Sequence, residues 1–394
     1  MATYIYYTPT KVVFGKDAVD ETGKLLKEYG AKKVLVHFGS QHAKKSGLVD
    51  RIEQRITEEG ISFVELGGVV PNPRLSKVNE GIALCRKEHV DFLLAVGGGS
   101  VIDSTKAIGY GLASGGDPWD FYSGKRKPTG CTRIGAVLTI AAAGSEMSDS
   151  SVITNEDGWL KRGTNSDYCR CTFAIEDPLL TMSLPHYQTM CGCVDIMMHT
   201  MERFFLGAHS MALTDAIALA LMKNVKEQAL ILQEEPSSYD ARANVMFASS
   251  ISHNGLTNMG NDNKGDWACH QLEHELGGIF DCAHGAGLAA MWPSWARFVM
   301  KNDYARFALF GKEVFGVTQS GDAKKDAEAA VQAVESFYRS IGMPTTLKEL
   351  GIAPTDEQIE ELATKCTFFG KRKIGTFMPL GHEEIVQIYK TARS

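Results

Sequence analysis

The sequence predicts two domains, an N-terminal α/β domain with a parallel sheet followed by an all-α C-terminal domain. Up to about residue 184, short apolar segments alternate with amphipathic ones, as in parallel strands that alternate with helices. Beyond that point apolar residues recur with helical periodicity only. Pro178 and Pro185 punctuate the chain at this change. We therefore expect domains at residues 1–183 and 184–394.

The individual elements follow from the same patterns. Two amphipathic segments, 46–60 and 74–89, are expected helices of the first domain. Short apolar runs predict its buried strands at 32–39, 61–66, 90–100, 134–144 and 171–178. Helical periodicity predicts helices of the second domain at 213–235, 240–255 and 326–342.

The composition is that of an ordinary globular protein. Among 394 residues, 44% are hydrophobic and 22% charged, and the net charge of −6 gives no reason to expect nucleic acid as a partner. No apolar run reaches the roughly 18 residues that would predict a membrane span, and no signal-peptide pattern opens the chain. Nine scattered cysteines indicate free thiols of a reducing compartment. We expect a cytoplasmic protein that contacts no membrane.

A glycine-rich segment, AVGGGS at 95–100, follows the third predicted strand and precedes a predicted helix. Backbone N–H groups at such a helix start form an anion site that suits a pyrophosphate, although tight turns need glycines as well. The pattern is neither G-x-G-x-x-G nor a Walker loop. A second candidate segment, 139–163, carries Lys161 and Arg162, but its residues 155–158 favour a hairpin turn.

Titratable side chains gather in two segments of the second half. Asp195 and His199 are four residues apart, which suits either half of a metal site or a buried hydrogen bond. His270, His274 and His284 lie within fifteen residues, and spacing alone would pair His270 with His274 on one helix face. Together the two segments offer nitrogen and carboxylate donors for Fe²⁺, Zn²⁺ or Ni²⁺.

These segments match a known pattern over nearly the whole chain. The sequence resembles the iron-containing (group III, metal-dependent) alcohol dehydrogenases, and within them the butanol dehydrogenase and broad aldehyde reductase branch. The resemblance is carried by GVVPNPRLSKVNEG (68–81), VDFLLAVGGGSVIDSTKAIG (90–109), AIEDPLLTMSLP (174–185), VDIMMHTMERF (194–204), SHNGL (252–256) and DWACHQLEHELGGIFDCAHGAGLAAMWPSW (266–295).

The resemblance implies a Rossmann-like domain, a helical metal-binding domain as in dehydroquinate synthase, and an active site in the cleft between them. It places the metal ligands on Asp195, His199, His270 and His284, with Fe²⁺ as the expected ion and Zn²⁺ or Ni²⁺ as alternatives. His274 falls on a family position that binds no metal and faces the nicotinamide and substrate. We expect it to be a catalytic residue that relays a proton.

The resemblance also implies the cofactor-binding residues. Asp103 is expected near the ribose and the substrate, where it would also be catalytic. Thr139 would line the nicotinamide and Lys161 would point toward the ribose. The pyrophosphate cradle maps to Gly97, Gly98, Gly99 and Ser100.

Two departures from the family pattern concern the cofactor. Ile140 stands where members commonly have a hydroxyl-bearing residue, and FGSQH (38–42) replaces a run such as YGGGS. No carboxylate occurs between Val34 and Val49 to bind the ribose 2′-OH, whereas Gly39 and Ser40 leave room and a donor, with Lys44 and Lys45 nearby. We therefore predict NADP(H) in preference to NAD(H).

The function implied is hydride transfer between nicotinamide C4 and a small primary alcohol or aldehyde whose oxygen binds the metal. The alternatives are a glycerol dehydrogenase or dehydroquinate synthase type of site, and a non-catalytic nucleotide- or metal-binding relative. The synthase uses a Glu ligand and additional lysines, so the expected ligand set favours the dehydrogenase. Family members are often dimers that pair N-terminal strands such as YIYYTP, and we expect a homodimer.

Overall fold

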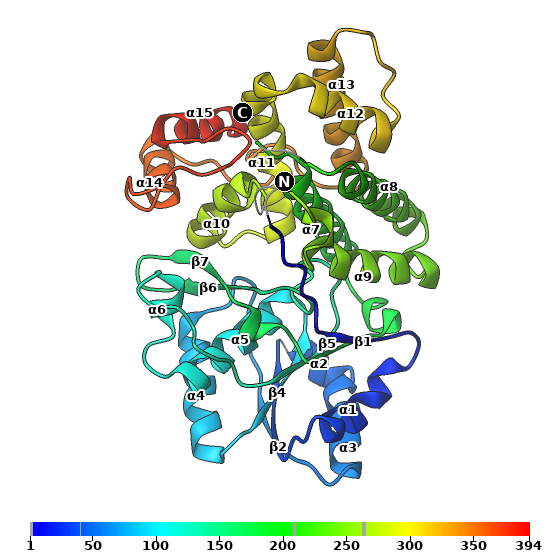
Figure 1. Cartoon of the computed structure of the whole chain (residues 1–394), viewed down its shortest axis with the longest axis vertical. Coiled ribbons are helices and arrows are strands. Elements are labelled where there is room, and N and C mark those ends of the chain that lie inside the picture. The colour runs from blue at the N-terminus through cyan, green and yellow to red at the C-terminus, as the bar shows by residue number, and fades with distance from the viewer. Residues whose placement is uncertain (1–2, 40, 208–209, 262–264) are drawn as a thin grey trace. The chain divides into compact units, whose positions relative to one another are not determined.

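The computed structural model describes residues 3–39, 41–207, 210–261 and 265–394, and the chain divides into two compact units (Figure 1). The α/β unit comprises Tyr7–Leu184 together with Ser249–Asn254. The helical unit comprises Met1–Tyr6, Pro185–Ala248 and Gly255–Ser394. The sequence did not predict that Ser249–Asn254 would belong to the α/β unit. Its periodicity predicts a single uninterrupted helix over 240–255, with no break at this point.

The α/β unit is built on a six-stranded sheet in which every pairing is parallel. The predicted fold class, a Rossmann-like domain joined to an all-helical one, is confirmed. The strands, in their spatial order, are β1 (Lys11–Phe14), β8 (Phe173–Glu176), β5 (Ile134–Leu138), β4 (Phe92–Gly97), β2 (Lys33–Phe38) and β3 (Ser62–Leu66). Five of them lie within predicted strands; β1, short and half exposed at the edge of the sheet, was not predicted.

Helices cover both faces of this sheet. Alternate residues of β2 and β4, such as Val34, Val36 and Leu94, are fully buried in the same core as α1 and α3. His37 points to the opposite face, where it contacts Ser104 of α5. The helices of this unit are α1 (Thr22–Glu28), α2 (Gln41–Lys45), α3 (Leu48–Glu58), α4 (Leu75–Glu88), α5 (Gly99–Ser114) and α6 (Trp119–Tyr122).

A separate antiparallel hairpin joins β6 (Ser150–Asn155) to β7 (Leu160–Asn165). Its turn overlaps residues 155–158, which favour a hairpin turn in the sequence. Lys161 therefore lies on a strand, and its side chain is buried.

Within its described residues the helical unit has no strand, and Ile374 and Leu380 form an isolated bridge. Helix α7 is buried along almost its whole length and packs against α8 and α11 (Figure 1). The helices are α7 (His186–Phe204), α8 (Ala212–Glu234), α9 (Tyr239–His253), α10 (Ala268–Phe280), α11 (His284–Val299), α12 (Tyr304–Phe315), α13 (Ala323–Ser340), α14 (Asp356–Cys366) and α15 (His382–Ala392).

Aromatic side chains form part of the core of the helical unit. Phe205 stacks on Phe307 with ring centroids 4.3 Å apart, and Trp292, Trp295 and Phe310 surround them. All five side chains are almost completely buried, so this core fixes α11 and α12 around α7. Across the described helices, none combines the length and apolar character needed to cross a bilayer.

Candidate active site

The first two residues of the candidate metal site come from the buried middle of α7. Asp195 and His199 are one helical turn apart and each is 3% exposed. Asp195 Oδ1 lies 3.3 Å from His199 Nδ1. A buried helix places both polar groups among apolar side chains, where a carboxylate is costly unless a cation or hydrogen-bond donors compensate it.

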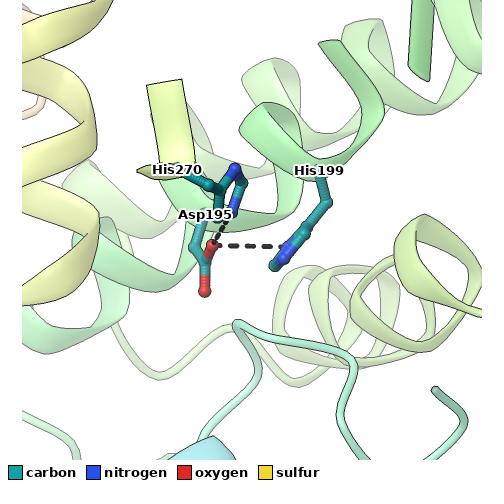
Figure 2. Close-up of side chains that lie close together, drawn as sticks. All are labelled: Asp195, His199 and His270. Carbon is teal, nitrogen blue, oxygen red and sulfur yellow. Dashed lines mark ion pairs between the residues drawn. The ribbon is translucent and has the colours of Figure 1, made fainter. Parts of the chain in front are cut away.

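Two further histidines approach the same carboxylate oxygen. His270 from α10 and His284 at the start of α11 each place Nε2 3.6 Å from Asp195 Oδ1. Figure 2 shows Asp195, His199 and His270, whose ligand atoms lie within 4.8 Å of one another. His284 is more exposed to solvent than the other three residues, with 28% of its side chain accessible. The structure thus brings together all four residues predicted to bind metal.

These four side chains fit a divalent metal ion. Within the described part of the chain, Asp195 Oδ1 and His270 Nε2 are buried and have no hydrogen-bond partner. Two such atoms facing each other cost free energy unless a further group binds both. Three imidazoles and one carboxylate are donors that iron, zinc and nickel accept.

Buried carboxylates lie behind two of the histidines. Glu202 Oε1 lies 3.1 Å from Nδ1 of His270 and also accepts the backbone N–H of His270 at 3.0 Å. Glu273 Oε2 forms a hydrogen bond with Nδ1 of His284. Burial lowers the pKa of His270, but the carboxylates of Asp195 and Glu202 outweigh it and raise that pKa to about 9. The surroundings of His270 therefore favour a positive charge, as a bound cation would supply.

Glu273 and Glu275, which lie between these histidines in the sequence, are both buried, and Glu273 contacts His284. Sequence reasoning missed Glu202 altogether. It lies seven residues after Asp195, two turns along the same helix, and that spacing was the available signal.

His274 lies beside the four-residue group without joining it. Its half-buried ring is 6.4 Å from the ring of His270 and 6.0 Å from that of His284, measured between centroids. Trp267 contacts the group from another side, with its ring centroid 5.3 Å from His270 and 6.0 Å from His199. The guanidinium of Arg203 stacks 4.6 Å above the Trp267 ring and so fixes this aromatic wall.

The residues predicted to bind the cofactor lie in the α/β unit, several of them at one edge of its sheet. The register pairs Phe38 with Val96 and Gly97 with Leu138, so Gly39, Gly98 and Thr139 all follow carboxyl ends of adjacent strands. The order of strands reverses between β2 and β4. Ligands of open parallel sheets bind at the carboxyl edge near such a reversal.

The three consecutive glycines allow a close approach of backbone segments. A Cβ on Gly98 would lie 3.0 Å from Ile140, and one on Gly99 would lie 2.8 Å from Ala143. These glycines therefore also serve the packing of the segment that follows β5. Gly98 precedes α5 and no side chain caps that helix, so its first N–H groups suit a phosphate.

The other predicted cofactor residues have different surroundings. Ser100 lies in the first turn of α5, and Lys161 lies on the hairpin. Asp103 accepts hydrogen bonds from the Ser145 hydroxyl at 2.6 Å and the backbone N–H of Val152 at 2.9 Å, so it supports the loop that follows β5. Its contact with a ribose stays a prediction, as does that of Lys161. The prediction for Ser40 falls outside the described residues.

Comparisons with known proteins decide the family. The family described as "Iron-containing alcohol dehydrogenase" matches residues 9–178, and its C-terminal domain, described as "Fe-containing alcohol dehydrogenase family, C-terminal", matches residues 189–393. The chain belongs to the iron-containing alcohol dehydrogenases. It is 37% identical to NADH-dependent butanol dehydrogenase A of Clostridium acetobutylicum, over 99% of each chain. It is 30% identical to the NADPH-dependent aldehyde reductase YqhD of Escherichia coli, over the full length of both.

Solved structures agree with this iron-containing alcohol dehydrogenase family. The crystal structure of NADH-dependent butanol dehydrogenase A from Thermotoga maritima matches with a TM-score of 0.95 and 35% identity, over 100% of this chain and 99% of that one. The enzyme is thus a metal-dependent alcohol dehydrogenase or aldehyde reductase that uses a nicotinamide cofactor, and the butanol dehydrogenase and aldehyde reductase branch is confirmed. The glycerol dehydrogenase and dehydroquinate synthase alternatives are not favoured.

Proposed function

We propose that the enzyme interconverts small primary alcohols and aldehydes by hydride transfer to or from C4 of a nicotinamide. The observation that carries this proposal is the convergence of three imidazoles on Asp195 Oδ1 in a buried part of the helical unit. A divalent metal there, Fe²⁺ in our proposal, supplies Lewis-acid stabilisation of charge on the substrate oxygen, and bound nicotinamide supplies or accepts the hydride.

The protein's own residues hold and orient these groups. Asp195, His199, His270 and His284 are the proposed metal ligands, and one carboxylate with three neutral imidazoles leaves a net charge of about +1 to balance one alkoxide. His274, whose ring lies beside those of His270 and His284, is the proposed proton relay. It would return a proton from solvent when an aldehyde is reduced and remove one when an alcohol is oxidised.

The cofactor is proposed to bind at the carboxyl edge of the parallel sheet. Gly97, Gly98 and Gly99, with Ser100, would offer backbone N–H groups to the pyrophosphate at the start of α5. Thr139 follows the adjacent strand and would line the nicotinamide. Asp103 and Lys161 would contribute near the ribose, Asp103 through the loop that it supports.

NADP(H) is the proposed preferred cofactor, because no carboxylate follows β2 to repel a 2′-phosphate. Lys44, which entered this prediction as a nearby cation, is paired with Glu65 of β3. The relatives named above carry both labels, NADH-dependent and NADPH-dependent. The ratio of kcat/KM for NADPH and NADH tests the preference, and a ratio below one contradicts it. Glu65→Gln should raise the ratio by releasing Lys44, and Gly39→Asp should lower it.

The decisive experiment combines metal analysis with a substrate panel. Protein purified without chelator should contain close to one equivalent of iron, and should reduce short aldehydes at the expense of NADPH. Asp195→Asn is the matched variant, because it removes one proposed ligand charge while preserving side-chain size. If metal-loaded protein binds NADPH but reduces no aldehyde, the proposal is wrong, and the chain is a non-catalytic nucleotide- and metal-binding protein.

Two broader expectations also remain proposals. A homodimer is supported by the edge position of β1 and by the exposed side chains of Ile5, Tyr6 and Tyr7 in the preceding segment. Light scattering coupled to size exclusion measures its mass directly. A cytoplasmic location is supported by the nine cysteines, which form no disulfide bond in the described structure and suit a reducing compartment.

A further inference from the structure

Two histidines of the candidate metal site share an arrangement that the family assignment does not describe. His270 and His284 both present Nε2 to Asp195 Oδ1, at 3.6 Å, and both present Nδ1 to a buried carboxylate. For His270 that carboxylate is Glu202, which is 2% exposed. For His284 it is Glu273, which has no exposed surface.

The chemistry of this contact fixes the tautomer of each ring. An ionised carboxylate only accepts hydrogen bonds, so Nδ1 of each imidazole must carry the hydrogen. In the neutral ring the lone pair is then on Nε2, which faces Asp195. A metal ion binds that lone pair, and a ring already held in this tautomer and orientation loses less freedom on binding.

We propose that Glu202 and Glu273 are positioning residues that hold His270 and His284 with Nε2 directed at the metal and so set the affinity of the site. This inference rests on the proposed metal site and goes beyond it, because it assigns a role to two residues that would not touch the ion.

The placement of the two glutamates supports this role. Glu202 is anchored by a second contact, since Oε1 also accepts the backbone N–H of His270. It is therefore fixed relative to the start of α10. Glu273 lies on α10 and contacts the first residue of α11, so it links the two helices that supply His270 and His284. Each glutamate thus connects one ligand to a different helix: Glu202 joins α7 to α10, and Glu273 joins α10 to α11.

The competing explanation is that the two glutamates only fill space in the core. Burial alone does not distinguish this structural role from the positioning of the histidines. In the described part of the chain, Glu202 Oε2 has no hydrogen-bond partner. An amide or an apolar side chain would meet packing requirements there at lower cost than a half-satisfied carboxylate. A carboxylate is preferable if the imidazole that it contacts binds a metal cation through its other nitrogen. The negative charge at Nδ1 makes the Nε2 lone pair a stronger ligand for the metal.

Cobalt titration of the metal-free full chain tests the proposal. Co²⁺ reports its ligand geometry through its visible absorption, so affinity and coordination are measured together without any turnover assay. Glu202→Gln and Glu273→Gln should each raise the Kd for Co²⁺ by about ten- to a hundredfold and alter the visible spectrum. Glu275→Gln is the matched control, because Glu275 is equally buried on the same helix, and it should change the Kd less than twofold.

Aspartate variants separate positioning from packing and cover the case in which an amide variant fails to fold. Glu273→Asp and Glu202→Asp keep the acceptor charge on a shorter side chain, so they should lose less affinity than the amide variants. Equal losses for Asp and Gln, or unchanged affinity in both Gln variants, would overturn the proposal while leaving the metal site in place. Wild-type protein that binds no stoichiometric Co²⁺ would instead overturn the proposed function.

Discussion

The imidazoles of His270 and His274 lie one turn apart on α10, yet their rings stand at 87° to each other with centroids 6.4 Å apart. Spacing at i and i+4 places both on one helix face, but it does not fix which way each ring turns. His270 directs Nε2 at Asp195 and Nδ1 at Glu202. His274 is half buried, whereas His270 is buried. The two histidines therefore have separable roles.

Replacing His274 should slow turnover without emptying the metal site. His274→Ala removes the proposed proton relay, and loss of a general acid–base group typically costs about a hundredfold to ten-thousandfold in rate. Iron content measured by plasma mass spectrometry should stay within about a fifth of the wild-type value.

The same measurements on two other variants provide the contrast. His270→Ala and His284→Ala each remove a proposed ligand and should purify with little metal. A metal-free His274→Ala protein would show that His274 is a ligand and that the assignment of the four ligands is incorrect.

Removing the metal should destabilise the helical unit selectively. Asp195, Glu202 and Glu273 are all buried, and removing the metal takes away a cation that balances part of their negative charge. A ligand present at a hundred times its Kd stabilises the folded state by about 2.7 kcal/mol, which sets the scale of the loss. Hydrogen exchange should increase in α7, α10 and the start of α11 after chelation.

The parallel sheet of the α/β unit serves as an internal control for this experiment, because it contains none of the proposed ligands. Asp195→Asn should already show the increased exchange and should not respond to chelator. Equal increases throughout both units would mean that the metal stabilises the chain in some other way.

The contrast between ligands and their supports shows what sequence reasoning can reach. Strands β2 to β5 and β8 were predictable because each is a short apolar run that ends in glycine or turn residues. Asp195, His199, His270 and His284, the proposed ligands, were selected through a family pattern, whereas Glu202 was missed. Its spacing from Asp195 indicates a shared helix face, but its proposed role depends on the relative rotation of α7 and α10, which no local pattern encodes. Strand β1 was missed because its apolar run is only three residues long, and the strand is exposed at both ends.

Stability should fall as the pH decreases below the ordinary range of histidine, because of His37. Its Nδ1 lies 2.7 Å from the carbonyl oxygen of Leu66, to which it must donate, and its Nε2 lies 2.9 Å from the hydroxyl of Ser104. Burial lowers the pKa of His37 from 6.5 to about 4. Between these values the unfolded chain binds the proton and the folded chain does not, so stability is present above pH 6.5 and is lost toward pH 4.

The shift corresponds to about 3 kcal/mol at most, since one pKa unit is worth about 1.4 kcal/mol. The free energy of unfolding should be measured for wild type and for His37→Gln across this pH range. The difference between the two proteins should become smaller toward low pH. His382→Gln is the control, because its side chain is 39% exposed. A difference that stays constant with pH would contradict the prediction.

Lys106 should prove essential for the loop that follows β5. Although it is completely buried, its Nζ donates to the carbonyl oxygens of Ser145, Ser148 and Ser150 at 2.7, 3.0 and 2.8 Å. Lys106→Met keeps the length of the side chain but leaves three carbonyls without this donor, at about 1–3 kcal/mol each. The melting temperature of Lys106→Met should therefore fall. The KM for the nicotinamide cofactor should rise, because Thr139, which is proposed to line the nicotinamide ring, directly precedes this loop. Lys24→Met, at a position 65% exposed, should change neither.

A buried pair of glutamates should make the α/β unit sensitive to alkaline pH. The hydroxyl of Ser250 lies 2.6 Å from Glu146 Oε1 and 2.7 Å from Glu176 Oε1. One hydroxyl donates a single hydrogen, so the second contact requires a proton on one carboxyl group. Burial raises the pKa of both carboxyl groups, and in Glu176 the charge of Glu146 raises it further. A raised pKa contributes stability at low pH that is lost as the pH rises through the folded-state value.

Glu176→Gln isolates this effect, because its amide supplies a permanent donor to Ser250 and removes one negative charge. Calorimetric melting temperatures of wild type and Glu176→Gln should be similar at pH 6, whereas at pH 9 the variant should be the more stable of the two. Glu227→Gln, an exposed change on α8, should follow wild type at both pH values. If Glu176→Gln is destabilised equally at pH 6 and pH 9, the pair shares no proton in the folded protein, and Glu176 is held as a carboxylate by interactions that outweigh its burial.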